Sequence, residues 1–221
     1  NHRMFLLNGD AKYMDVFERT LYNGFLAGVS LEGDTFFYPN PLESNGATGF
    51  NHGTATRAPW FGCSCCPVNV ARFVPSLANY VYAQRDNEVF VNLFMGGEAT
   101  LDVDGTPVKL IQDSNYPWDG AIEIVVEPTE SAEFALNVRI PGWALGQPMA
   151  SDLYRYQNPQ SEAFELAVNG GPQEPELVNG YAPLKRTWFK GDTVHLTLPM
   201  PIRRVLAHED VKADRGRVAI E

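Results

Sequence analysis

Residues 60–82 read WFGCSCCPVNVARFVPSLANYVY, and this stretch decides how the chain divides. From Pro67 to Val81 apolar residues recur at three- and four-residue steps, the spacing of one face of an α-helix. Pro67 suits a first helical position, whereas Pro75 should remove one backbone hydrogen bond and kink the axis. After Tyr82 the apolar period changes from 3.6 to 2. We therefore predict helical structure before this point and β-structure after it.

All three cysteines of the chain, Cys63, Cys65 and Cys66, lie at the start of this predicted helix. The N–H groups and dipole of a helix N-terminus favour negative charge, and a thiolate is both a nucleophile and a soft metal ligand. The residues alone leave four interpretations open: inert packing, a disulfide, a metal site completed from outside the chain, and a nucleophile. A disulfide between adjacent cysteines would be strained, and structural zinc sites usually have a second cysteine pair, which this sequence lacks.

The composition indicates a globular chain without a nucleic-acid or membrane partner. With 221 residues, of which 44% are hydrophobic, it can bury one or two ordinary cores. The formal net charge of -10 argues against binding to a phosphate backbone. No window approaches 18 consecutive apolar residues, so we predict no membrane-spanning helix. Neither an initiator methionine nor a signal peptide is evident, and we expect further residues at both ends; the compartment, exported or cytoplasmic, stays open.

The first 43 residues predict two helices and a short strand. Residues 1–8 read as a helix that Asn8-Gly9 ends, and Asp10 caps an amphipathic second helix. That helix carries Met14, Phe17, Leu21 and Phe25 at helical spacing, so it should pack in a helical layer. Residues 35–38, TFFY, predict a short aromatic strand ended by prolines.

Residues 44–59 are rich in Gly, Asn, Thr and Ala and lead directly to the cysteines. A loop of this length is uncommon inside a compact domain and is often a binding loop. Its His52 is either a solvated polar residue or a functional one. Arg57 and Trp60, which flank the cysteines, are either a packed aromatic with a stacked guanidinium or ligand contacts.

The second part of the chain predicts an antiparallel β-sandwich, because many short alternating runs follow one another without a helical spacer. A strand is expected at residues 88–95 and a hairpin around Asp104-Gly105. Further strands are expected at residues 122–126, 134–140, 164–168 and 194–198. Trp118, Trp143 and Trp188 suit core and edge packing better than a sugar-stacking platform. We place the domain boundary between residues 86 and 87.

Several segments together resemble one family. They are residues 9–13 (GDAKY), 18–24 (ERTLYNG), 36–42 (FFYPNPL), 60–72 (WFGCSCCPVNVAR) and 213–219 (ADRGRVA). In this order they resemble the bacterial β-L-arabinofuranosidases of glycoside hydrolase families 127 and 146, over nearly the whole chain; Val68 departs from a proline that is common there. The resemblance implies a mixed α and β multidomain fold. Residues 1–86 would be the C-terminal part of an (α/α)6 catalytic barrel, and residues 87–221 β-sandwich material truncated at its end.

The resemblance also implies a function. Members of that group are retaining exo-glycosidases in which a zinc-bound cysteine, rather than a second carboxylate, attacks the anomeric carbon, an exception to the two-carboxylate scheme. Carried over to this sequence, Cys65 would be the nucleophile and a zinc ligand, and Cys66 a second ligand. Tyr38 and Cys63 would lie near the sugar. The cofactor would be zinc, and the substrate an arabinose-containing oligosaccharide or polysaccharide of plant type with terminal β-L-arabinofuranose.

The resemblance places the acid/base glutamate and two further zinc ligands, a Glu-x-Cys pair, upstream of Asn1. We therefore expect these 221 residues to be half an active site, with no turnover and no tight zinc binding without the N-terminal remainder of the enzyme. Glu43 is the nearest local carboxylate, but a loop glutamate is usually solvated. Two alternatives stay open: a hydrolase for another furanose-like sugar, and a non-catalytic carbohydrate-binding or structural β-sandwich module.

Overall fold

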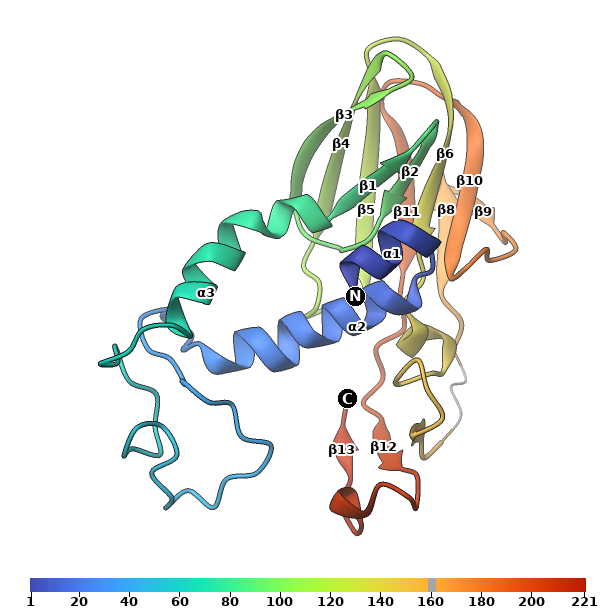
Figure 1. The fold of residues 1–221 in the computed structure, drawn as a ribbon. Helices are drawn as coiled ribbons and strands as arrows, with labels where there is room; N and C mark the ends of the chain where they lie inside the picture. The colour runs from blue at the N-terminus through green and yellow to red at the C-terminus, as the bar shows by residue number, and fades with distance from the viewer. Residues whose placement is uncertain (159–161) are drawn as a thin grey trace. The chain divides into compact units, whose positions relative to one another are not determined.

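The computed structural model describes residues 1–158 and 162–221, which form two compact units (Figure 1). Residues Asn1–Val16 and Tyr80–Glu221 form the first, here called the sheet unit. Residues Phe17–Asn79 form the second, here called the cysteine unit. The boundary that the sequence suggests between residues 86 and 87 stays a prediction.

The two N-terminal helices form as the sequence predicts. Helix α1 (His2–Asn8) ends at Gly9, which adopts the left-handed conformation with φ of 66°. The Asp10 carboxylate then accepts a hydrogen bond of 3.0 Å from the Lys12 N–H at the start of α2 (Lys12–Arg19). Beyond α2 the helix continues as a π-helix (Thr20–Phe25) and a short 3₁₀-helix (Leu26–Gly28). No helix in the described part of the chain is long and apolar enough to cross a membrane.

The predicted helix after the cysteines changes type part of the way along. It is an α-helix, α3, over Pro67–Phe73 and a 3₁₀-helix over Val74–Tyr80. The change falls next to Pro75, which has no N–H to donate to the preceding turn. The expected interruption at Pro75 thus coincides with a change of helix type, and the kink of the axis stays a prediction.

The predicted strand at residues 35–38 is wrong. Phe36 alone pairs, in isolated bridges to Val29 on one side and Ala58 on the other. The ladder does not extend, because the Tyr38 N–H donates to the side chain of Asn51 instead of to a neighbouring strand.

In the described part of the chain the strands form three sheets, and Figure 1 labels most of these strands. One has four strands in the order β1-β2-β6-β10, a second has six in the order β3-β4-β5-β11-β8-β9, and a small third sheet has the order β13-β12-β7. The bounds are β1 Tyr82–Arg85, β2 Glu88–Val91, β3 Gly97–Val103, β4 Thr106–Ser114, β5 Ala121–Pro128, β6 Ala132–Arg139, β7 Tyr154–Tyr156, β8 Glu165–Val168, β9 Gly171–Gln173, β10 Tyr181–Trp188, β11 Asp192–Thr197, β12 Arg204–Ala207 and β13 Ala219–Ile220. Short 3₁₀-helices lie at Gly142–Leu145 and Lys212–Asp214.

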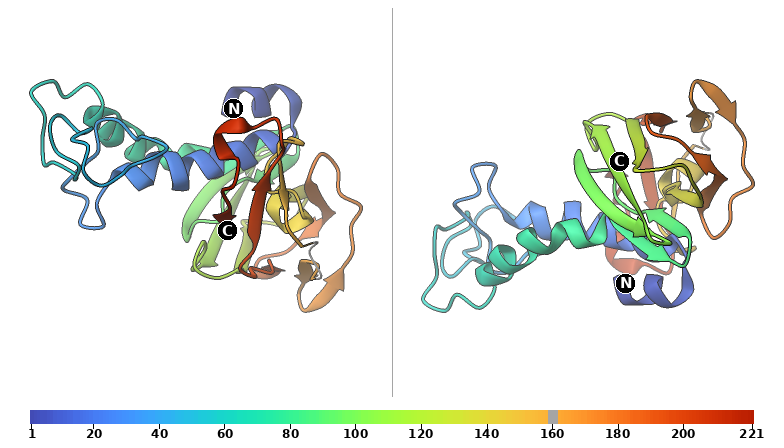
Figure 2. Two further views of the ribbon diagram at one scale, coloured as in Figure 1. Left: turned by 90° about the horizontal axis from the view of Figure 1, so that it is seen from below. Right: turned by 90° about the horizontal axis from the view of Figure 1, so that it is seen from above.

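The two larger sheets, whose strands Figure 2 shows from two further sides, share one apolar core, as expected for a sandwich. Buried side chains of β2, β6 and β10 pack in the same cluster as those of β3, β4, β5, β8 and β11. Among the described strands, pairing is antiparallel except between β2 and β6, which run parallel, so the wholly antiparallel prediction is wrong at that pair. After β2 the chain builds β3–β5 in the other sheet and then returns beside β2 in the same direction.

The hairpin and two of the three tryptophans agree with the predictions. Asp104 and Gly105 turn between β3 and β4 with φ of 51° and 83°. Trp188 is fully buried and its Nε1 donates to the Phe134 carbonyl at 3.2 Å, while Trp143 packs against the core. Trp118 is 83% exposed, so the packing prediction is wrong for this residue: it lies in the loop between β4 and β5.

A buried ion pair joins the first turns of α2 to the sandwich within the sheet unit. The Arg139 side chain on β6 is fully buried, and its Nη1 lies 2.6 Å from Asp15 Oδ1. Arg139 Nε donates to the Asn92 carbonyl at 2.6 Å, and the Tyr181 hydroxyl donates to Asn92 Oδ1 at 2.6 Å. Burial raises the pKa of Tyr181, so this hydroxyl stays a donor. Asp15 also accepts a hydrogen bond of 3.2 Å from the Gly142 N–H.

Candidate active site

The three cysteines lie in the cysteine unit, on the turn that leads into α3. All three are free thiols; Cys63 and Cys65 are exposed and Cys66 is partly buried. The disulfide interpretation therefore does not describe this structure, and inert burial does not describe Cys63 or Cys65. Cys66 is the residue before Pro67, the first residue of α3, so the sulfurs lie where the sequence places them, at a helix start.

The Tyr38 hydroxyl contacts the sulfurs of Cys65 and Cys63. It lies 2.7 Å from Cys65 Sγ and donates a longer contact of 3.9 Å to Cys63 Sγ. The hydrogen bond to Cys65, with smaller contributions from Cys63 and Cys66, raises the pKa of Tyr38. Tyr38 therefore keeps its proton near neutral pH and can donate a hydrogen bond to a sulfur acceptor. The structure thus brings together all four residues that the resemblance singles out.

The backbone of Cys65 is held from α3. The Asn69 side chain donates to the Cys65 carbonyl at 2.8 Å, and Arg72 donates to the Asn69 side-chain oxygen at 2.7 Å. These contacts link the turn to the second turn of the helix. Sequence reasoning missed Asn69, although its spacing of four residues from Cys65 is typical of a side chain that bonds back along a helix.

The ring of Tyr38 lies in a small aromatic cluster. Its centroid is 4.4 Å from that of His52 and 5.2 Å from that of Phe61, and these two rings are 5.2 Å apart. Phe61 is buried, with 7% of its surface exposed, and anchors the cluster. His52 itself is exposed. The sequence left open whether His52 is a solvated or a functional residue, and the structure places its ring against Tyr38 of the candidate site.

Arg57 and Trp60, which flank the cysteines, do not stack on each other. Arg57 stacks over Phe37 at 4.5 Å and donates to the Ala27 carbonyl at 2.7 Å. Trp60 is 59% exposed, so it is not the packed partner of a guanidinium. Glu43 lies in an exposed part of the loop, as expected for a loop glutamate.

The geometry of Cys65 and Cys66 fits two corners of a tetrahedral zinc site. Their sulfurs are 3.8 Å apart. Two sulfurs that share a tetrahedral zinc, each bonded at about 2.3 Å, are separated by roughly this distance. Within residues 1–158 and 162–221, no group of three or more His, Cys, Asp or Glu side chains is arranged to hold a metal ion. The described residues therefore offer two ligands and need partners from elsewhere to complete a four-coordinate site.

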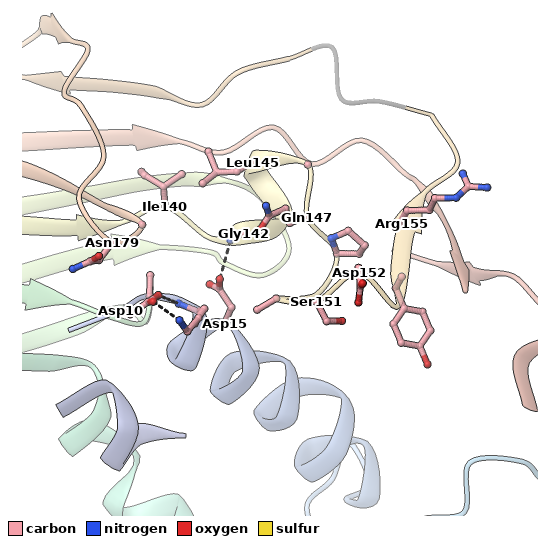
Figure 3. A pocket seen from close by; sticks show the side chains of 17 residues that line it. Asp10, Asp15, Ile140, Gly142, Leu145, Gln147, Ser151, Asp152, Arg155 and Asn179 are labelled. Carbon is pink, nitrogen blue, oxygen red and sulfur yellow. Dashed lines mark hydrogen bonds and ion pairs between the residues drawn. The ribbon is translucent and has the colours of Figure 1, made fainter. Parts of the chain in front are cut away.

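A separate cavity of about 680 Å³ lies in the sheet unit (Figure 3). Asp10, Asp15, Gln147, Asp152 and Asn179 are among its lining residues. Figure 3 shows Asp15 turned to the Gly142 N–H and Asp10 engaged at the start of α2, where it pairs with Lys12 at 2.7 Å. None of the residues that the sequence singles out for chemistry lines this cavity.

Comparison with known proteins defines the class, since both parts of the chain match models of enzymes that hydrolyse glycosidic bonds. Residues 88–200 match the model described as "Beta-L-arabinofuranosidase, GH127 middle domain". Residues 1–79 match the model described as "Beta-L-arabinofuranosidase, GH127 catalytic domain". The chain belongs to the GH127 β-L-arabinofuranosidase family, as the resemblance predicted.

Similar proteins can be aligned with this chain over nearly its whole length. A "Non-reducing end beta-L-arabinofuranosidase" of Bifidobacterium longum is 34% identical, over 99% of this chain and 32% of the relative. A solved structure described as a GH127 β-arabinofuranosidase has a TM-score of 0.93 at 48% identity, covering 100% of this chain and 34% of that one. A GH127 β-L-arabinofuranosidase from Geobacillus stearothermophilus has a TM-score of 0.84 at 39% identity, covering 99% and 33%. The chain thus spans about a third of the length of these relatives.

Proposed function

We propose that the chain is the C-terminal portion of a retaining exo-glycoside hydrolase that releases terminal β-L-arabinofuranose from arabinose-containing oligosaccharides or polysaccharides. The observation that carries the proposal is the exposed Cys65 sulfur at the start of α3, 2.7 Å from the Tyr38 hydroxyl, in a chain of the GH127 family. Its likeness to an enzyme described as acting at the non-reducing end supports the exo mode and the sugar.

The proposed reaction has two displacements at the anomeric carbon. In the first, the Cys65 sulfur forms a bond to that carbon while the glycosidic C–O bond breaks, and the departing oxygen takes a proton from a carboxylic acid. In the second, water attacks the same carbon, its proton passes to that carboxylate, and the C–S bond breaks. Two inversions give net retention. In line with the resemblance, the acid comes from the part of the enzyme that this chain does not span.

Cys65 and Cys66 would hold a zinc ion, whose charge keeps the Cys65 sulfur deprotonated at neutral pH. The spacing of 3.8 Å between their sulfurs supports this assignment. The two further ligands would belong to the rest of the enzyme, where residues 1–86 would complete an (α/α)6 barrel.

Tyr38 and Cys63 complete the proposed site on the sugar side. The phenol can donate to the Cys65 sulfur, and when a sugar is attached to that sulfur it can turn its donor to a ring or hydroxyl oxygen of the sugar. Cys63 is exposed beside it and would form part of the wall against which the sugar lies.

The test compares Cys65→Ser with Cys63→Ser in the complete enzyme. A hydroxyl is far less ionised than a thiol, so Cys65→Ser should lower kcat for an aryl β-L-arabinofuranoside by about 10³-fold or more. Cys63→Ser changes a residue of the proposed sugar-binding wall and not the nucleophile, so it should raise KM while lowering kcat far less than Cys65→Ser does. Equal and mild effects of the two substitutions would favour a non-catalytic sugar-binding module instead.

Zinc can be tested separately from turnover. Elemental analysis should find zinc in stoichiometric amount in the complete enzyme and not in the Cys65→Ser, Cys66→Ser double variant. The 221 residues alone supply two ligands, so they should bind zinc weakly. A nanomolar dissociation constant for zinc measured on these residues alone would contradict the proposed sharing of ligands.

A further inference from the structure

Two consecutive residues of the loop before the cysteines, Asn51 and His52, hold Tyr38 from its two ends. Asn51 contacts the main chain of Tyr38, and His52 contacts its ring. Both lie 13 or more positions from Tyr38 in the sequence. The phenol beside Cys65 is therefore placed by residues of the loop that contact Tyr38 itself.

Asn51 is the buried polar centre of this loop. It is fully buried, and its Oδ1 accepts a hydrogen bond of 2.7 Å from the Tyr38 N–H. Its Nδ2 donates to the Phe36 carbonyl at 3.2 Å and to the Thr56 carbonyl at 2.8 Å. Two of these hydrogen bonds tie Asn51 to Phe36 and Tyr38, and the third ties it to Thr56 farther along the loop. A buried amide with this many partners specifies one arrangement, because any shift leaves a buried polar group unpaired.

His52 contacts the other end of the residue. Its backbone has φ of 53°, the left-handed region that a residue with a side chain rarely adopts. In this conformation its ring meets the Tyr38 ring edge to face, at 4.4 Å and 62° between planes, and also lies against the buried Phe61. The unusual backbone follows directly after Asn51, whose hydrogen bonds can offset its cost of about 1–2 kcal/mol.

We infer that Asn51 and His52 are positioning residues that keep the Tyr38 hydroxyl on the Cys65 sulfur, Asn51 by fixing the backbone and His52 by packing on the ring. The inference rests on the proposed function for its catalytic consequence but not for its geometry. The hydrogen bonds of Asn51 and the ring contacts of His52 go to Tyr38 and its neighbours and not to the Cys65 sulfur, so each residue acts through Tyr38. Their loss should reduce the rate in the enzyme–substrate complex more than substrate binding, because misplacement of a group by about 1 Å is enough to slow a reaction strongly.

The chain offers a matched control in the same loop. Asn45 also uses its side-chain oxygen to accept backbone N–H groups, from Ala47 at 3.0 Å and Thr48 at 2.8 Å. It is exposed, and its hydrogen bonds stay within a local turn. Asn45→Ala therefore removes the same kind of interaction from the same loop without touching Tyr38.

The kinetic test is a double-mutant cycle in the complete enzyme with Tyr38→Phe. Asn51→Ala should lower kcat about tenfold to a hundredfold with little change in KM, and Asn45→Ala should change kcat less than twofold. In the Tyr38→Phe background, Asn51→Ala should lower kcat by no more than a further two- or threefold, because the hydroxyl it positions is already absent. Fully independent losses would show that Asn51 does not act through Tyr38 and would overturn the inference.

Conservative variants separate positioning from other roles. Asn51→Asp keeps the acceptor for the Tyr38 N–H and, as a protonated buried carboxyl, one of the two donors, so it should retain more activity than Asn51→Ala. His52→Phe keeps a ring and should retain most of kcat, while His52→Ala should not. If His52→Phe were as damaging as His52→Ala, the ring nitrogens rather than the packing would matter, and the role assigned to His52 would be wrong.

One further readout needs no activity and so separates this inference from the proposed function. Hydrogen exchange, followed by mass spectrometry of the peptide that contains Tyr38, should be faster in Asn51→Ala than in wild type and unchanged in Asn45→Ala. If Asn51→Ala does not fold, His52→Ala and Asn51→Asp carry the same comparison. If exchange is faster in Asn51→Ala but the enzyme proves to act on another sugar, the positioning role of Asn51 and His52 stands and only the proposed substrate is wrong. If exchange is unchanged in Asn51→Ala, the inferred positioning role is wrong even if the substrate is as proposed.

Discussion

The sheet unit and the cysteine unit are stabilised in different ways. In the sheet unit, strands of two sheets bury one continuous apolar core that includes Trp188. In the cysteine unit, the segment between the helices forms only isolated bridges, and side-chain to backbone hydrogen bonds of Asn51, Arg57 and Ser30 hold it in place. The cysteines and Tyr38, which are the candidate site residues, lie in the cysteine unit.

This difference separates stability from function. A packed sandwich tolerates few changes inside, but its outer loops carry little energy. A loop held by a few polar contacts can place one hydroxyl beside one sulfur without a large core. Substitutions should therefore divide into those that unfold the sheet unit and those that weaken catalysis while the fold persists.

The largest effect on stability is expected inside the sandwich. Trp188→Ala removes a fully buried indole and its hydrogen bond to Phe134, so it should lower the free energy of unfolding by about 3–5 kcal/mol. Trp118→Ala, in the same unit but 83% exposed, should change it by less than about 0.5 kcal/mol. Denaturant unfolding followed by circular dichroism measures both. Equal losses would mean that the core does not dominate this unit.

The buried ion pair should give the next largest effect. Asp15→Ala removes a carboxylate that lies 2.6 Å from the buried Arg139 guanidinium, which should lower the free energy of unfolding by about 3 kcal/mol. The matched control is Glu98→Ala, which breaks the exposed pair with Lys109 and should have an effect below about 1 kcal/mol. Thermal unfolding of the two variants gives the comparison. A loss no larger for Asp15→Ala than for Glu98→Ala would show that Arg139 finds other partners.

A smaller effect is expected at the β3–β4 turn. Gly105 has φ of 83°, so Gly105→Ala forces a side chain into a disfavoured backbone region and should cost about 1 kcal/mol. Gly28 has an ordinary backbone and open space around its Cα, and Gly28→Ala should be close to neutral. Equilibrium unfolding in urea distinguishes the two. A neutral Gly105→Ala would mean that the hairpin relaxes to another turn.

The smallest effect should come from a polar contact of the cysteine unit. Arg57→Met removes the hydrogen bond to the Ala27 carbonyl and the stacking over Phe37, with an expected loss of about 0.5–1 kcal/mol. It should show as faster hydrogen exchange in peptides of residues 24–40, with exchange in the sandwich unchanged. Spread of the change into β6 would mean that the two units do not differ as described.

Sequence patterns predicted the periodic parts of this fold. The α1–α2 pair, the hairpin around Asp104-Gly105 and most of the inner strands follow from local spacing and turn residues. Strand β10 was missed because Pro183, Lys185 and Arg186 break its alternation, while its burial comes from pairing with β6. The parallel β2–β6 pair was missed because a sequence pattern does not fix the order of strands in a sheet.

Some features of the candidate site could likewise be predicted from the sequence, and others could not. The cysteine cluster at a helix start can be seen in the sequence, and the resemblance points to Tyr38. Asn51 in the loop, and the pairing of Asp15 with Arg139 outside the site, could not be predicted, because each depends on partners that only the tertiary fold brings close. Asn51 carries no apolar or catalytic signal, and its role appears only in its burial and its three hydrogen bonds.

The central claim is that sulfur of Cys65 bonds to the sugar, and direct detection of that bond tests it best. The complete enzyme would be mixed with an activated aryl β-L-arabinofuranoside, quenched in acid within milliseconds, digested and analysed by mass spectrometry. The account predicts a pentosyl group on the peptide that spans residues 63–72, fragmenting to place it on Cys65, and absent from Cys65→Ser. A pentosyl group on a carboxylate, or an unmodified Cys65 peptide during rapid turnover, would contradict it.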